Sequence, residues 1–138
     1  MSSTFESSIK VIPYSQQKVY NNISDLNNLE KVKDRIPQDK VKNFIFDHDS
    51  VSISVSPVGD IKIHIIERDE PKCIKFETEK SPVPFFLWIQ IVPESDDSCK
   101  IKLTLKAELN PFIKGMVSGP LKDGLEKVAE ALAQVHYE

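Results

Sequence analysis

The sequence has little arginine, and its charge balance is slightly acidic. Of its 18 basic residues only Arg35 and Arg68 are arginines, and the formal net charge is −3. Arginine is the usual bidentate reader of phosphates and guanine edges. Because affinity for nucleic acid comes mostly from neutralised phosphates, this composition predicts that the protein does not bind nucleic acid.

Cysteine and glycine are also scarce. Cys73 and Cys99 are far apart and lack the Cys-x-x-Cys spacing of zinc or redox sites, so we expect two reduced thiols. The sequence contains no phosphate-binding loop, dinucleotide motif or Gly-x-Ser-x-Gly nucleophile motif. We therefore predict no catalytic residue, no metal site and no cofactor from motifs.

Long hydrophobic runs are missing as well. The longest apolar stretch, residues 83–89, is too short to span a bilayer and contains Pro84. Residues 1–6 have neither a basic start nor an apolar run, so they do not resemble a signal peptide. We expect no membrane span and a cytoplasmic location. A chain of 138 residues with 40% hydrophobic and 28% charged residues is typical of one globular domain, residues 1–138.

The N-terminal part predicts one strand and two short helices. Residues 4–12 alternate, with Phe5, Ser7, Ile9 and Val11 expected on one buried face. Ser15 is a suitable N-cap for a short helix. A second short helix is expected from residue 24 or 25, including Leu26, Leu29, Val32 and Lys33, and it ends before Pro37.

Between residues 40 and 109 the hydrophobic period is two, which predicts six further strands joined by tight turns. Asp47-His48-Asp49 suggests a metal site, but its position at a hairpin tip favours a turn. One side of this antiparallel sheet is apolar and the other is polar.

The C-terminal part predicts one long helix. Asn110 is a good N-cap and Pro111 suits the first helical position. Apolar residues then recur at spacings of three and four to about residue 135, with a kink or a break expected at Pro120. This is the long amphipathic element that can cover the apolar face of the sheet.

The order of these elements resembles the START-like superfamily, also called SRPBCC, which includes pollen allergens, polyketide cyclases and a small type of carbon-monoxide-dehydrogenase subunit. Local signatures that carry the resemblance are Tyr14-Ser15, residues 25–29, Val58-Gly59-Asp60 and Asn110-Pro111-Phe112. The resemblance implies an α+β helix-grip fold. A seven-stranded antiparallel sheet of order 1-7-6-5-4-3-2 would wrap around the C-terminal helix, with two short helices after strand 1. It also implies a cavity between sheet and helix that binds an apolar small molecule or lipid.

The expected lining consists of apolar residues on the inner side of the strands and on one face of the helix. These candidate ligand-binding residues are Phe46, Val55, Ile63, Phe76, Leu87, Ile89, Leu103, Met116, Val117, Leu121 and Gly124. Glycine destabilises a helix by about 1 kcal/mol relative to alanine. Either room for a ligand or a close strand contact would explain Gly124. The alternative is that these side chains simply fill the core.

Few residues suggest catalysis. His64 is expected to face solvent, and His136 lies near the C-terminus. Tyr20, Glu67 and Arg68 are the best candidates for an alternative function, an enzyme of the polyketide-cyclase or dehydratase type. No motif of such enzymes carries over residue by residue, so we favour a protein that is not an enzyme.

Phe86 and Trp88 alternate with the inward-facing residues, which places them on the outer face of the sheet. Two exposed aromatic residues predict a homodimer interface or another protein-interaction surface. A backbone irregularity after Pro84 that turns Trp88 inward is the alternative.

Overall fold

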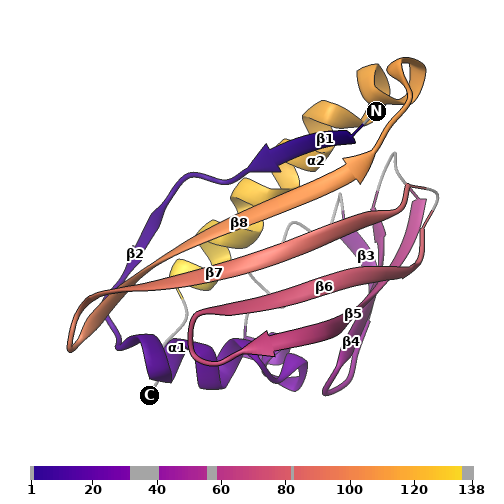
Figure 1. Cartoon of the computed structure of the whole chain (residues 1–138). Coiled ribbons are helices and arrows are strands. Elements are labelled where there is room, and N and C mark those ends of the chain that lie inside the picture. The colour runs from indigo at the N-terminus through magenta and orange to yellow at the C-terminus, as the bar shows by residue number, and fades with distance from the viewer. Residues whose placement is uncertain (1, 32–40, 56–58, 82, 135–138) are drawn as a thin grey trace.

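An antiparallel sheet dominates the structure, a computed structural model that describes residues 2–31, 41–55, 59–81 and 83–134 (Figure 1). The strands are β1 (Ser2–Glu6), β2 (Lys10–Ile12), β3 (Val41–Phe46), β4 (Ser50–Val55), β5 (Gly59–Asp69), β6 (Cys73–Lys80), β7 (Phe85–Ser95) and β8 (Ser98–Glu108). Their order is β1-β8-β7-β6-β5-β4-β3, and β2 also pairs with β8. The predicted strand order is confirmed, with the first predicted strand divided into β1 and β2.

A bulge separates β1 from β2. Glu6 is opposite Thr104 and Lys10 is opposite Ile101, so the N-terminal strand has one residue more than β8 between these pairs. One extra residue reverses which side chains face the core. Ile12 is therefore fully buried, whereas Ile9 and Val11 are exposed. The prediction that Ile9 and Val11 share the buried face is wrong for this reason.

The helices follow the predicted caps. In α1 (Gln16–Ile23) Ser15 caps the first turn, and in α2 (Pro111–Ala133) the Asn110 side chain accepts a hydrogen bond from the Ile113 amide at 2.8 Å. Helix α2 continues through Pro120, so a break there is excluded. The second short helix is the 3-10 helix η1 (Leu26–Lys31), and Val32 and Lys33 lie outside the described residues.

The helices cover one face of the sheet, which we call the inner face. Helix α2 contacts β1, β2 and β8 and lies behind these strands in Figure 1. Helix α1 contacts β7 and β8, and η1 contacts β3. The sheet thus curves around α2, as in the predicted helix-grip arrangement, while α1 and η1 lie along one end of it (Figure 1).

Among the described residues, no helix has the length and apolar composition needed to cross a membrane. Cys73 and Cys99 are both free thiols, as expected. Burial raises the pKa of both thiols, that of Cys99 to about 11.

Candidate ligand-binding face

The inner face is apolar along its whole described width. Directly paired residues of antiparallel strands point to the same side, and Phe76, Leu87 and Leu105 form one such row across β6, β7 and β8. Phe76, Ile89 and Leu103 are buried. These three predicted lining residues therefore belong to the packed core that lies beneath the helices.

Part of the inner face is incompletely covered. Its members are apolar side chains that pack against the core but stay partly exposed: Phe46 on β3, Ile53 on β4, Ile63 on β5 and Leu87 on β7. We call these four residues the open apolar surface. Helix α2 contacts the opposite part of the sheet, around β8. The helix therefore covers one half of the inner face more completely than the other.

Helix α2 is oriented by a polar anchor on its β2 side. Glu126 accepts hydrogen bonds from the Ser8 amide and hydroxyl and lies 2.7 Å from the ammonium group of Lys10. At about 100° per residue, Gly124 and Val128 each lie about 200° around the helix from Glu126. Both are exposed, and Val128 retains 37% of its accessible surface. The side of α2 turned away from β2 therefore carries accessible, uncharged surface.

Gly124 has free space beside it. A Cβ atom built at this position has no heavy atom within 4 Å. Of the two explanations that the sequence left open, a close strand contact is therefore excluded. Room beside the helix remains.

The other predicted helix residues divide into two groups. Val117 and Leu121 are buried and pack in the core, as expected. Met116 is 60% exposed, so the prediction that it packs toward the sheet is wrong. It lies about 100° around the helix from Val117, outside the buried stripe. Val55 ends β4, but its side chain lies outside the part that the structure describes.

The three residues considered for catalysis do not converge on the open apolar surface. Tyr20 is buried in α1, and burial, followed by the Glu70 carboxylate, raises its pKa. Arg68 donates two hydrogen bonds to the carbonyl of Ser24 and one, at 2.6 Å, to Asp49. Glu67 is exposed. Arg68 thus links the end of α1 to the β3–β4 turn, which is a structural role.

The histidines occupy the positions that the sequence predicted. Asp47 accepts hydrogen bonds from the amides of Asp49 and Ser50, which confirms the turn at 47–49. His48 lies in this turn, with Nδ1 3.0 Å from a carboxylate oxygen of Asp25. His64 is opposite the outward-facing Glu77. Within the described ranges, no group of three or more potential ligands could hold a metal ion, and His136 lies outside those ranges.

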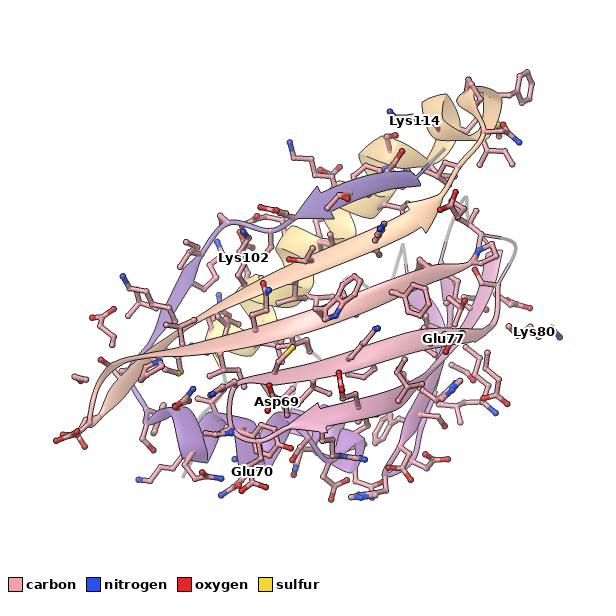
Figure 2. All side chains as sticks on the ribbon, viewed as in Figure 1. Asp69, Glu70, Glu77, Lys80, Lys102 and Lys114 are labelled. Atoms are coloured by element: carbon pink, nitrogen blue, oxygen red, sulfur yellow. The ribbon has the colours of Figure 1, made fainter. Side chains whose placement is uncertain are left out.

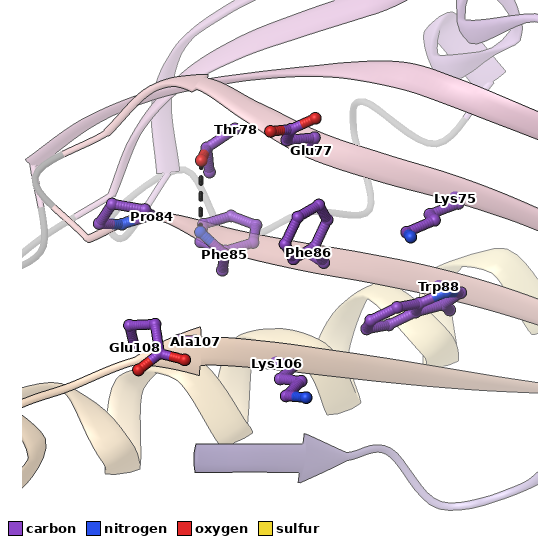
Figure 3. A pocket seen from close by; sticks show the side chains of 10 residues that line it. All are labelled: Lys75, Glu77, Thr78, Pro84, Phe85, Phe86, Trp88, Lys106, Ala107 and Glu108. Carbon is purple, nitrogen blue, oxygen red and sulfur yellow. Dashed lines mark hydrogen bonds between the residues drawn. The ribbon is translucent and has the colours of Figure 1, made fainter. Parts of the chain in front are cut away.

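The outer face carries a surface depression of about 340 Å³ at the ends of β6, β7 and β8 (Figure 3). Phe86 and Trp88 line it, so Trp88 faces outward and the inward alternative is wrong. Charged side chains surround these rings: Lys75, Glu77, Lys106 and Glu108. Strand alternation predicted the faces of the aromatic residues. The depression itself depends on side-chain packing and had no sequence signal.

No family model and no curated protein matches the chain, whereas solved structures match it closely in shape. Norcoclaurine synthase from Thalictrum flavum is 18% identical, with 97% of this chain and 86% of that chain covered and a TM-score of 0.75. A START superfamily protein from Mycobacterium smegmatis is 15% identical, with coverages of 96% and 93% and a TM-score of 0.59. The chain has the START-like fold. The resemblance indicated by the sequence is therefore confirmed at the level of the fold.

A protein from Thermus thermophilus has the same fold, at 16% identity and a TM-score of 0.69, with 96% of this chain and 95% of that chain covered. Structures with this fold thus include a named enzyme and a protein named only by its superfamily. The START-like fold therefore leaves the choice between binding and catalysis to the residues of the site.

Proposed function

We propose that this protein binds an uncharged apolar small molecule or lipid between the open apolar surface of the sheet and the Gly124–Val128 side of α2. The observation that carries the proposal is the incomplete burial of apolar side chains on the inner face, Ile53 and Ile63 among them. Burying such surface against an apolar ligand is favourable, at roughly 25 cal/mol per Å². The free space beside Gly124 supports the same placement.

The polar groups favour a neutral ligand and a binding function. Among the described residues, the buried polar or charged ones are Ser3 and Ser7. A charged ligand group would need a compensating partner, because an unpaired buried charge is strongly unfavourable. An enzyme of the cyclase or dehydratase type would need an acid or base on this surface. The buried residues described here include no carboxylate, histidine or lysine.

The test uses the neutral dye Nile red and its displacement by oleyl alcohol. We expect saturable binding, and we expect Val128→Glu to weaken it at least tenfold because a carboxylate would then face the ligand. Val92→Glu is the matched control, since Val92 is 56% exposed on β7 and pairs with Lys100, away from the open apolar surface. Absence of saturable binding, or equal weakening by both substitutions, would contradict the proposal.

Two further predictions accompany this function. The cytoplasmic location expected from the sequence stays a prediction. Homodimer formation through Phe86 and Trp88 is a second proposal, and it does not depend on what the inner face binds. The observation that favours it is the partial exposure of both rings on the outer face, where Phe86 retains 37% of its accessible surface.

A further inference from the structure

The aromatic residues of the outer face lie in two adjacent rows across the sheet. In one row Lys75 is opposite Trp88, which is opposite Thr104. In the next row Glu77 is opposite Phe86, which is opposite Lys106. We call these six residues the outer patch. Figure 2 shows this face toward the viewer, with Glu77 labelled on β6.

The outer patch is partly preorganised by contacts within the chain. The ammonium nitrogen of Lys75 lies 4.9 Å from the ring centre of Phe86 and 5.3 Å from that of Trp88. The two ring centres are 6.1 Å apart. Aromatic rings held by a cation in this way lose little freedom when they bind a partner.

The charges of the outer patch are complementary to themselves. On β6 the cationic Lys75 stands in the Trp88 row, and the anionic Glu77 stands in the Phe86 row. Exchanging the two rows by a rotation of 180° therefore places opposite charges against each other. A two-fold interface has this property, because the same surface is used by both copies.

We propose that the outer patch binds a second copy of this chain around a two-fold axis that crosses the strands between the two rows. Lys75 of each copy then faces Glu77 of the other, and Phe86 faces Trp88. The depression beside these residues receives the opposing side chains (Figure 3). This arrangement rests on the proposed homodimer and specifies its geometry.

Other occupants and other axes agree less well with the pattern. A polyanion would meet Glu77 and Glu108 beside the lysines of the depression. A two-fold axis parallel to β7 would instead place Lys75 against Thr104 and Glu77 against Lys106. That axis leaves Lys75 without an opposing charge, so the two axes predict different effects of a charge reversal at Lys75.

The experiment measures self-association by sedimentation velocity for the full chain and its charge-reversal variants. We expect a wild-type dimer, and at least tenfold weaker association for Lys75→Glu and for Glu77→Lys, since each brings like charges together. Mixing the two variants should restore a heterodimer, because one copy then presents two carboxylates to the two ammonium groups of the other. Restoration also shows that both variants are folded.

Lys114→Glu is the matched control, because it changes the charge equally at an exposed position of α2 outside the outer patch. It should leave the dimer unchanged. A wild-type monomer at all concentrations would overturn the homodimer itself. A dimer that survives Lys75→Glu, or variants that fail to associate on mixing, would overturn this arrangement alone. Nile red binding by the dissociated variants separates both outcomes from the ligand-binding proposal.

Discussion

The ammonium nitrogen of Lys10 lies 2.7 Å from a carboxylate oxygen of Glu126, which joins β2 to α2. The same carboxylate accepts hydrogen bonds from the Ser8 amide at 2.8 Å and from the Ser8 hydroxyl at 2.6 Å. These bonds, with Lys10 first, lower the pKa of Glu126 to about 2. The bulge between β1 and β2 thus places both donors beside the helix.

We predict that Glu126→Gln destabilises the protein by about 1 kcal/mol at neutral pH, a value reduced for the partial exposure of the pair. The folded pKa is below the ordinary value of 4.5. The stabilisation is therefore complete above about pH 4.5 and is lost as the pH falls toward 2. Urea unfolding of both proteins across this range measures it.

The control for this prediction is Glu130→Gln. The Glu130 carboxylate is 3.8 Å from the ammonium nitrogen of Lys10 and is 54% exposed. Its substitution should change the free energy of unfolding by only a few tenths of a kcal/mol. Equal effects of the two substitutions would show that the anchor at Glu126 is not special.

Gly124 offers a separate test of the space beside α2. We predict that Gly124→Ala raises the free energy of unfolding by roughly 0.5–1 kcal/mol, since alanine is favoured in a helix and nothing lies within 4 Å of the added Cβ. Gly124→Phe should leave the protein folded but occupy the space proposed for the ligand. Nile red binding should then fall at least tenfold in the phenylalanine variant alone.

Ser7 has a buried hydroxyl that completes the bulge. Its Oγ accepts a hydrogen bond from the Leu103 amide at 2.9 Å and donates one to the Ser8 carbonyl at 3.0 Å. We predict that Ser7→Ala costs about 1–3 kcal/mol, because the Leu103 amide loses its partner. Thermal unfolding measures the change.

Ser3→Ala is the matched control for Ser7→Ala. The Ser3 hydroxyl is buried on β1 and has no hydrogen-bond partner within the described part of the chain. Removing it should be neutral or slightly stabilising. A large loss at Ser3, or none at Ser7, would contradict this assignment of the two hydroxyls.

Cys99 should resist alkylation. With its pKa raised to about 11, only about one thiol in a thousand is ionised near pH 8, and the side chain is fully buried. Mass spectrometry after treatment with iodoacetamide should show no labelling of Cys99 in the native protein and rapid labelling in urea. Fast labelling of Cys99 without denaturant would contradict the described packing.

The sequence predicted the strands, the sheet order and the helix caps, because alternation and capping residues act locally. It missed the bulge at residues 7–9, since one inserted residue leaves the composition of the strand unchanged while reversing its faces. The register between Glu6 and Thr104 becomes known only when two distant segments are paired.

The candidate site was predicted less completely than the fold. Helical spacing placed Val117 and Leu121 in the core, but it could not show how wide a stripe of α2 the sheet covers. Met116 therefore appeared inward from the sequence and is exposed in the structure. The open apolar surface depends on where the helix ends its contacts with the sheet, and no single residue encodes that.

Pairing of β1 with β8 has a consequence for how the chain closes. Joining Glu6 to Thr104 closes a loop of nearly the whole chain, whereas joining Phe76 to Leu87 closes a short one. Loop-closure entropy increases with length, so among the described strand pairs the N-terminal junction has the largest entropic cost. Because α2 contacts β1, β2 and β8, the two ends of the polypeptide must meet before the helix is fully gripped.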